Sequence, residues 1–273
     1  MDNIIALLTD FGAKGEHYVA SMKGVLLKIN PSVRIIDISH NISAFSILEA
    51  SFLIKSSYKY FPEKTVFIMV IDPGVGTSRE ILAIRTKSQH YFIGPNNGIF
   101  SLITKEKNIL ECVEIKNSDY FNPIVSKTFH GRDIMAPVAA HITLGVKIKE
   151  IGPYFELEKI LKYPVIYGVD QNNKKIECTI QYIDSFGNIT TNIPIRSNFI
   201  KGTSLPIVYG DSINFQWEDQ NYEAKLTTHF GTEPKNQFLF IIGSSGFLEI
   251  SRNQDNAAKY LGLKVGDIIT ITL

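Results

Sequence analysis

Residues Val66–Arg79 read VFIMVIDPGVGTSR, and this stretch decides the fold of the first half of the chain. Its six opening residues are apolar, and five of them are β-branched or aromatic, which is typical of a strand buried on both faces. The run is too short for a helix that must end at Pro73. Because the residue before a proline favours extended backbone, Asp72 is predicted at the carboxyl end of the strand, where open α/β sheets bind their ligands.

The turn after this strand forms the first candidate site. Pro73, Gly74 and Gly76 make the turn compact and leave little side-chain bulk in it. Arg79 follows closely enough for its guanidinium to fold back toward the carboxylate of Asp72. We therefore expect a carboxylate and a cation side by side at the edge of the sheet.

The surrounding pattern predicts an α/β domain. Apolar runs at residues 4–8 and 33–38 read as strands, and helical spacing of apolar residues at 17–29 and 46–60 places one helix after each of them. Three strands that alternate with two helices favour a parallel sheet with right-handed crossovers. We predict a Rossmann-like α/β domain with a mostly parallel sheet over residues 1–160. Two further strands, a short helix and a longer helix are expected at residues 81–86, 90–93, 99–104 and 134–144.

The character of the sequence changes after Gly152 and Pro153. Short β-rich runs follow one another and are separated by turn signals such as Asn-Asn, Gly-Asn and Gly-Ser-Ser-Gly. This pattern favours a small barrel or sandwich, and we predict a smaller carboxy-terminal antiparallel β-barrel domain over residues 165–273. The expected strands lie at residues 165–169, 175–183, 189–192, 212–215, 224–228, 238–242, 247–251 and 267–272.

Composition excludes several classes of protein. The chain of 273 residues has 28 basic and 27 acidic side chains, so no net field attracts nucleic acid or an anionic membrane. No apolar run reaches membrane-spanning length, and the amino terminus lacks the basic and apolar regions of a signal peptide. Cys112 and Cys178 lie far apart without other metal-ligating residues at zinc spacing. We expect two buried thiols and a cytoplasmic protein.

Charged and imidazole side chains gather at the predicted strand ends and in the loop before residue 134: Asp10, Asp37, Asp72, Asp133, His40, His130, Arg79 and Arg132. Three interpretations stay open. The carboxylates could only cap turns and helices. They could bind a divalent metal together with the imidazoles, although no His-x-x-x-His or Asp-x-Asp spacing is present. They could also belong to an enzyme without metal, in which a carboxylate, a guanidinium and an imidazole converge on one small nucleophile.

His130 is the histidine whose surroundings most favour a functional role. It stands between Phe129 and Gly131-Arg132-Asp133 in a predicted loop, and loops carry a large share of functional residues. His141, in contrast, lies on an apolar helical face and is expected to be structural.

Eight motifs, taken together and in this order, resemble the S-adenosyl-L-methionine (SAM) hydroxide adenosyltransferase family, which is related to the fluorinating and chlorinating enzymes. The resemblance extends over nearly the whole chain. The motifs are Thr9-Asp10-Phe11-Gly12, Met22-Lys23-Gly24, Asp37-Ile38-Ser39-His40, Asp72-Pro73-Gly74-Val75-Gly76-Thr77, Gly94-Pro95-Asn96-Asn97-Gly98, Phe129-His130-Gly131-Arg132-Asp133, Asp184-Ser185-Phe186-Gly187-Asn188 and Arg252-Asn253.

The resemblance implies hydrolysis of SAM to adenosine and L-methionine, by attack of water or hydroxide on the 5′ carbon of the ribose. By motif, the family's Asp, Arg and His set around the oxygen nucleophile maps onto Asp72, Arg79 and His130. Halide-using relatives lack this set at the matching places, so its presence implies water. Whether His130 accepts the proton or only orients the oxygen stays open.

The resemblance also assigns the substrate-binding residues. It places Asp10 on the ribose diol and Phe45 near the sugar, and Phe186 belongs to the same binding set. It places Asn188, Arg252 and Asn253 by the adenine, and Asp184 with Ser244 at the methionine end. Ser245 stands where the halogenating relatives carry an arginine, which leaves the methionine carboxylate without an assigned partner. The family further implies a homotrimer, with each site between the amino-terminal domain of one subunit and the carboxy-terminal domain of its neighbour.

The reaction implied by the resemblance requires no metal and no cofactor, because a sulfonium is already a good leaving group. Three alternatives remain. They are a SAM-dependent halogenating enzyme, a non-catalytic protein that binds SAM or adenosine, and a metal-dependent hydrolase acting on a nucleotide.

Overall fold

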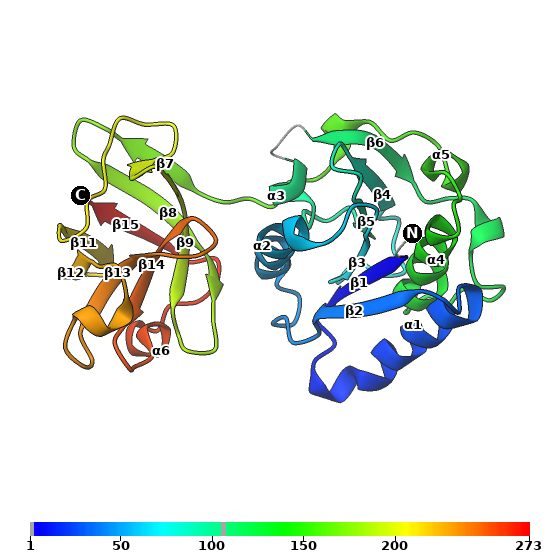
Figure 1. Cartoon of the computed structure of the whole chain (residues 1–273), viewed down its shortest axis with the longest axis horizontal. Helices are drawn as coiled ribbons and strands as arrows, with labels where there is room; N and C mark the ends of the chain where they lie inside the picture. The colour runs from blue at the N-terminus through cyan, green and yellow to red at the C-terminus, as the bar shows by residue number, and fades with distance from the viewer. Residues whose placement is uncertain (1–2, 105–107) are drawn as a thin grey trace. The chain divides into compact units, whose positions relative to one another are not determined.

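The computed structural model describes residues 3–104 and 108–273 and divides into two compact units, Met1–Tyr163 and Pro164–Leu273. The first unit is an α/β domain built on one sheet of order β2-β1-β3-β5-β4-β6 (Figure 1). Strands β2, β1, β3 and β5 pair in parallel, and β4 runs antiparallel to both β5 and β6. The predicted mostly parallel sheet is confirmed. Its strands are β1 (Ile4–Thr9), β2 (Arg34–Ser39), β3 (Val66–Val70), β4 (Ile81–Thr86), β5 (Tyr91–Pro95) and β6 (Ile109–Glu114).

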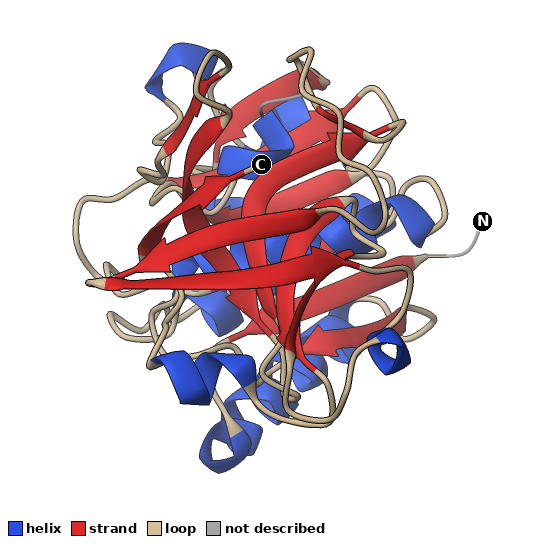
Figure 2. Cartoon of the chain, turned by 90° about the vertical axis from the view of Figure 1, so that its left-hand side faces the viewer, coloured by secondary structure: helices blue, strands red, loops and turns tan. Residues whose placement is uncertain are grey.

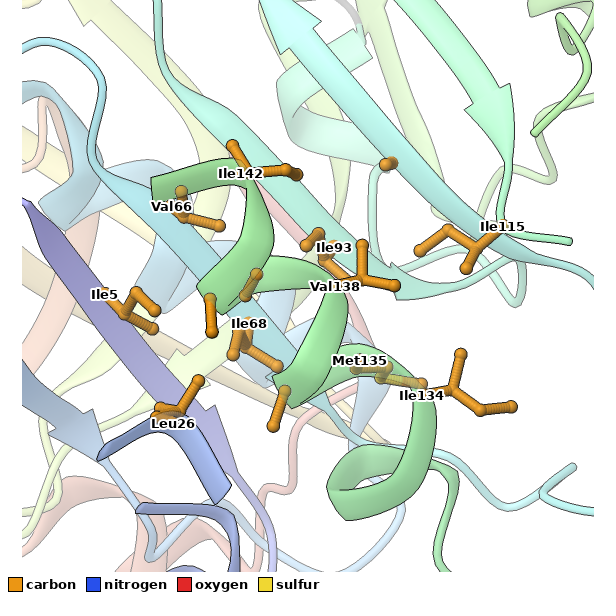
Figure 3. Packing of buried hydrophobic residues seen from close by; sticks show 14 of the residues in the cluster. Ile5, Leu26, Val66, Ile68, Ile93, Ile115, Ile134, Met135, Val138 and Ile142 are labelled. Atoms are coloured by element: carbon orange, nitrogen blue, oxygen red, sulfur yellow. The ribbon is translucent and has the colours of Figure 1, made fainter. Parts of the chain in front are cut away.

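Helices cover both faces of this sheet. Helices α1 (Glu16–Ile29), α4 (Ala136–Thr143) and α5 (Ile148–Ile151) pack on one face, and α2 (Ile47–Ser57) and α3 (Ser101–Thr104) on the other. Figure 3 shows the first of these interfaces, where Leu26 of α1 and Val138 and Ile142 of α4 meet Ile5 and Ile68. Short 3-10 helices lie at Ala13–Gly15, Tyr58–Tyr60, Ser118–Tyr120 and Leu157–Lys159.

Strand β3 is buried on both faces, as its sequence predicts. All five of its residues are buried. Val66, Ile68 and Val70 join the cluster under α1 and α4, while Phe67 and Met69 join the cluster under α2 and α3. Because each side chain on the strand has a packed neighbour, the backbone of β3 fixes where its carboxyl end, and therefore Asp72, lies.

The second unit is a closed β-barrel. The pairings run β9-β14-β13-β12-β11-β15-β8, and β8 pairs again with β9 to complete the ring. All of these pairings are antiparallel except β12 with β13, which is parallel and joined by the connection 227–237. This connection contains the 3-10 helix Phe230–Thr232. The ring strands are β8 (Lys175–Ile183), β9 (Ile189–Arg196), β11 (Ser212–Trp217), β12 (Gln220–Leu226), β13 (Phe238–Ile242), β14 (Phe247–Arg252) and β15 (Ile268–Thr272).

The barrel prediction is confirmed, with smaller elements added to it. Strands β7 (Tyr167–Asp170) and β10 (Phe199–Ile200) flank the ring, and helix α6 (Ala257–Leu261) packs on its core. Figure 2 shows the strands of this unit facing the viewer. Within residues 3–104 and 108–273, no helix is long and apolar enough to cross a membrane.

Candidate active site

Asp72, Arg79 and His130 form one hydrogen-bonded chain in the first unit. The Nε of Arg79 donates to Asp72 Oδ1 at 2.8 Å, and its Nη2 donates to Asp72 Oδ2. The same Nη2 lies 3.0 Å from Nδ1 of His130. The side chains of Arg79 and Asp72 are only 10% and 5% exposed. A two-point guanidinium–carboxylate contact of this kind fixes both groups in orientation as well as in distance.

The turn that carries Asp72 packs tightly on the loop that carries His130. Gly76 has φ +81°, and a β-carbon there would lie 2.3 Å from the backbone oxygen of Lys127. Only glycine allows both the backbone conformation and the close approach. The two loops are therefore held together by backbone packing as well as by Arg79.

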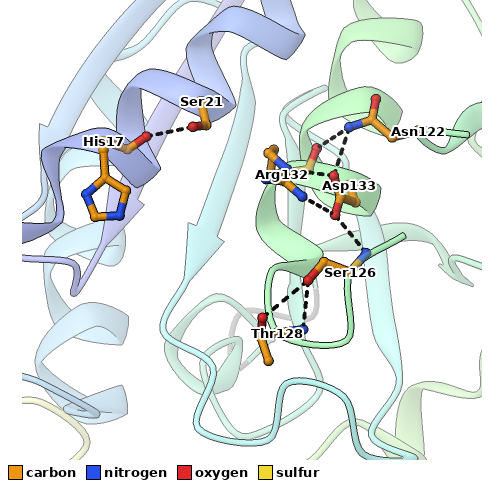
Figure 4. Close-up of polar contacts among 7 residues, drawn as sticks. All are labelled: His17, Ser21, Asn122, Ser126, Thr128, Arg132 and Asp133. Atoms are coloured by element: carbon orange, nitrogen blue, oxygen red, sulfur yellow. Dashed lines mark hydrogen bonds and ion pairs between the residues drawn. The ribbon is translucent and has the colours of Figure 1, made fainter. Parts of the chain in front are cut away.

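Asp133 anchors the loop before α4 through contacts with Arg132, Asn122 and Ser126 (Figure 4). This almost fully buried carboxylate accepts two hydrogen bonds from Arg132, one from the side chain of Asn122 and one from the backbone N–H of Ser126. Burial alone would raise the pKa of Asp133, but these hydrogen bonds outweigh it and lower the pKa. The carboxylate is thus charged and fully engaged in structure, which explains its place in the motif without a catalytic role.

The helix that follows begins earlier than the sequence predicts. A π-helical turn at Gly131–Met135 precedes α4, so His130 lies directly before a helix start instead of in an extended loop. Gly131 packs closely on Val70 of β3, so that a β-carbon there would lie 3.0 Å from a Val70 methyl group and the valine would have to shift. Short π-helical turns recur at functional sites because they displace one side chain from the regular helical spacing.

A cavity of about 430 Å³ opens beside this chain and is lined by Asp10, Phe45, Asp72 and His130, among others. Three aromatic rings, those of Phe11, Tyr18 and Phe129, form one wall, with centroids 5.2 to 5.8 Å apart. The sequence does not predict this wall, because Tyr18 lies within the helical spacing of residues 17–29. Its one signal is the proximity of Phe11 and Phe129 to Asp10 and His130 in sequence.

Phe45 and Asp10 contact each other across the cavity rim. The backbone N–H of Phe45 donates to Asp10 Oδ2 at 2.9 Å, and Phe45 has φ +65°, a conformation that few non-glycine residues adopt. Its ring is 67% exposed. Burial raises the pKa of Asp10 more than the backbone hydrogen bonds lower it, and the nearby charge of Asp72 raises it further. Strain of this kind occurs at ligand sites, where it holds a group in place before the ligand arrives.

His130 is a weaker base than an ordinary histidine. Burial lowers its pKa below the usual 6.5, the charge of Arg79 lowers it further, and the carboxylates of Asp72 and Asp133 only partly offset this. The ring is consequently neutral near pH 7. Since a guanidinium can only donate, the Nδ1 that faces Arg79 is an acceptor, and the proton of the neutral ring lies on Nε2.

Only some of the predicted substrate-binding residues of the second unit lie together. Phe186, Asn188 and Arg252 line one cavity of about 650 Å³, together with Phe230 from the connection between β12 and β13. The ring of Phe186 is 77% exposed. Arg252 lies over the ring of Tyr260, with 3.9 Å between the guanidinium carbon and the ring centroid. An exposed aromatic ring and a held guanidinium offer stacking surfaces for a planar group.

Asp184, Ser244 and Asn253 do not line this cavity. Asp184 accepts from the backbone of Phe186 and Asn188 and from the side-chain amide of Asn188 at 2.8 Å, so it shapes the loop that presents the other two. Asn253 donates to the backbone oxygen of Glu233. Next to Ser244, the hydroxyl of Ser245 is buried and has no hydrogen-bond partner among the described residues.

A second cavity and the buried thiol of Cys112 do not offer the chemistry of a reactive centre. A cavity of about 700 Å³ is lined by none of Asp72, Arg79 and His130, and two of its charged residues, Arg85 and Glu111, pair with each other at 2.9 Å. In the part of the chain that the structure describes, no three His, Cys, Asp or Glu side chains are placed to hold a metal ion. Burial raises the pKa of the Cys112 thiol to about 12, so this group is not a reactive thiolate at neutral pH.

Comparison with known proteins points to one family. Residues 5–152 match the description "SAM hydroxide adenosyltransferase N-terminal domain", and residues 178–270 match "SAM hydroxide adenosyltransferase C-terminal domain". The chain is 37% identical to the "(R)-S-adenosyl-L-methionine hydrolase" of Methanocaldococcus jannaschii, across 98% of this chain and 95% of that protein. It is 26% identical to a "Fluorinase" from Actinoplanes sp., across 98% and 97% of the two chains. The crystal structure of an uncharacterized conserved protein from Thermotoga maritima superposes with a TM-score of 0.89 at 36% identity, covering 98% of this chain and 100% of that one.

Proposed function

This chain belongs to the SAM hydroxide adenosyltransferase family, and we propose that it is an enzyme that hydrolyses SAM to adenosine and L-methionine. The observation that carries the proposal is the Asp72–Arg79–His130 chain, whose Asp72 and His130 line a cavity that is also lined by Asp10 and three aromatic rings. The curated relative of 37% identity is named for this activity, whereas the fluorinase is more distant.

The reaction is a displacement at the 5′ carbon of the ribose. The oxygen of water forms a bond to this carbon while the carbon–sulfur bond breaks, and the electron pair of that bond neutralises the sulfonium. One proton leaves the attacking water. Because the leaving group is already activated, the protein's task is to hold the water in line with the sulfur, an effect worth on the order of 7–11 kcal/mol in well-oriented reactions.

We assign the proton acceptor to Asp72 and an orienting role to His130. Both oxygens of Asp72 already accept from Arg79, but each retains a second lone pair for the O–H of a water. The Nδ1 of His130 is occupied by Arg79, so its protonated Nε2 can donate to the oxygen of that water but cannot take a proton from it. Arg79 holds both groups and places a positive charge beside the developing hydroxide.

The activity should depend on the neutral form of His130. We expect kcat/KM to rise with pH and to reach its plateau near neutrality, with a midpoint below 6.5 because the pKa of His130 in the free protein is lowered. Protonation would place a second N–H against Arg79 and disrupt the chain. His130→Gln, which keeps a donor near the Nε2 position, should retain part of the turnover and lose this pH limb. His130→Ala should lower kcat about 100-fold. A wild-type rate for His130→Ala would contradict the assignment.

Asp10 is expected to act in binding rather than in turnover. Asp10→Asn should raise KM about 10- to 100-fold and change kcat only a few-fold, since hydrogen bonds from ribose hydroxyls to a charged carboxylate are worth about 1.5–3 kcal/mol. Steady-state kinetics with SAM measures both constants. A variant that loses kcat at unchanged KM would remove Asp10 from the binding set.

The direct test is product analysis. We expect adenosine and methionine when the protein is incubated with SAM, and one ¹⁸O atom in adenosine when the reaction runs in H₂¹⁸O. Runs in chloride and fluoride buffers test for 5′-halo-adenosine, which would assign the halogenating reaction instead. Activity that a chelator abolishes and a divalent ion restores would overturn the metal-independent mechanism. Binding of SAM without turnover would make the protein a sensor.

We also propose a homotrimer that acts in the cytoplasm, with each site between the first unit of one subunit and the second unit of a neighbour. Two observations support this assembly: the proposed binding residues divide between the two units, and each unit presents an exposed aromatic ring at its own cavity, Phe45 and Phe186. The free thiols of Cys112 and Cys178 suit a reducing compartment. Light scattering of the purified protein measures the assembly.

A further inference from the structure

Behind the cavity, four polar side chains connect the end of β1 to helix α1. The hydroxyl of Thr9 lies 2.9 Å from Nδ1 of His40. The Nε2 of His40 lies 3.0 Å from Asp37 Oδ1, a contact of ion-pair length, and Lys23 Nζ donates to Asp37 Oδ2 at 2.6 Å. None of the four is among the residues that line the cavity, and the reaction above uses none of them.

His40 contacts the chain on both sides of Asp10. Thr9, which precedes Asp10, is fully buried and contacts the imidazole. Gly12, which follows two residues later, donates its backbone N–H to the backbone oxygen of His40 at 2.7 Å. Gly12 has φ +66°, which suits glycine. The four-residue segment Thr9–Gly12, which presents Asp10, is thus attached at both ends to one residue of the next loop.

The remaining contacts fix the ring itself. The hydrogen bond from Lys23 and the close contact with His40 outweigh the effect of burial and lower the pKa of Asp37, so this group is a carboxylate. The Nδ1 of the ring shares a hydrogen bond with the hydroxyl of Thr9, in which the hydroxyl can either donate or accept. The imidazole side chain is only 18% exposed, so water competes little for these contacts.

We propose that His40 is a positioning residue for substrate binding: its contacts with Thr9 and Gly12 hold the carboxylate of Asp10 in the orientation that accepts the two ribose hydroxyls of the nucleoside. The inference rests on the proposed role of Asp10. It adds to the site a residue that does not touch the substrate. It also predicts that the Nδ1 of His40, which contacts Thr9, matters more for substrate binding than the Nε2.

Two substitutions at His40 distinguish the contribution of Nδ1 from that of Nε2. In His40→Asn the amide lies near the Nδ1 position and can still meet Thr9, whereas in His40→Gln it lies near Nε2 and cannot. We expect His40→Gln and Thr9→Val to raise KM for SAM and Kd for adenosine about 5- to 10-fold, with kcat unchanged within about 2-fold. His40→Asn and Thr9→Ser, which keep the contact between the two side chains, should retain most of the wild-type binding affinity. The affinity for 2′-deoxyadenosine, which offers no diol, should change much less than that for adenosine.

A double-mutant cycle tests whether the effect passes through Asp10. Combined with Asp10→Asn, His40→Gln and Thr9→Val should have almost no further effect on adenosine binding. The same 5- to 10-fold loss in the Asp10→Asn background, or an equal loss for adenosine and 2′-deoxyadenosine, would overturn the inference while leaving the hydrolase assignment intact. A wild-type protein that binds no adenosine and forms no products would overturn both. If His40→Gln does not fold, as judged by circular dichroism, Thr9→Val carries the test alone.

Discussion

Asp72→Asn is expected to lower kcat about 1,000-fold with little change in KM. The substitution keeps the shape of the side chain but removes the negative charge that we assign as proton acceptor, a role worth about 10²–10⁴ in rate. It also leaves the guanidinium of Arg79, 10% exposed, without its carboxylate. Removing one partner of such a buried pair destabilises a protein by about 3–5 kcal/mol, and urea denaturation measures this loss.

A second substitution separates catalysis from folding. Asp72→Asn combined with Arg79→Gln removes both charges, so the double variant should recover most of the stability that the single variant loses. It should not recover turnover, since the charged proton acceptor is still absent. Turnover restored together with stability would show that Asp72 acts only through the fold. If Asp72→Asn alone is as stable and as active as the wild type, the Asp72–Arg79–His130 chain contributes neither to folding stability nor to catalysis.

Gly76→Ala is expected to be strongly destabilising, although it introduces only one methyl group. Alanine at φ +81° is strained, and its β-carbon would lie 2.3 Å from the backbone oxygen of Lys127. Strain and overpacking together should lower the free energy of unfolding by about 2–5 kcal/mol. Relief of the contact must move the Asp72 turn away from the His130 loop. Because a misplacement of about 1 Å can reduce a rate 100-fold, kcat should fall as well.

Gly145→Ala provides the matched control. Gly145 has φ +101°, but a β-carbon there meets no atom within 4 Å. This variant should therefore show the backbone strain alone, about 1–2 kcal/mol, at full kcat. The difference between the two variants measures the packing of Gly76 on Lys127. Equal losses of stability, or full activity of Gly76→Ala, would contradict a role for this packing in holding the site.

Local sequence predicts the elements and several of the site residues, because burial and turn chemistry are local. The run ending at Pro73 predicts β3 and the position of Asp72, and the spacing to Arg79 predicts the ion pair that is observed. Strand β6 was missed, since it pairs with one neighbour only and carries exposed Leu110 and a polar Glu111 among its six residues. Helix α6 was missed because five residues are too few to show a helical period.

Contacts between loops that are distant in sequence cannot be predicted from local sequence patterns. Arg79 and His130 are 51 residues apart, and no pattern in either segment specifies the 3.0 Å contact between them. The glycine-rich turn indicated a need for space at Gly76 but not that the backbone oxygen of Lys127 occupies it. The contact of His40 with Thr9 could not be predicted for the same reason, since the two residues lie in different motifs. The family resemblance supplied roles for residues whose geometry only the folded chain reveals.

The barrel of the second unit is closed by seven strands, and this odd number constrains the directions in which they run. In a closed ring, neighbours can alternate in direction throughout only if their number is even, so an odd ring must contain at least one pair that runs the same way. Here that pair is β12 and β13. Two strands that run the same way cannot be joined by a tight hairpin, and the chain must travel back along the outside. The connecting segment 227–237 brings Phe230 to the cavity, so the odd number of strands itself supplies part of the lining of that cavity.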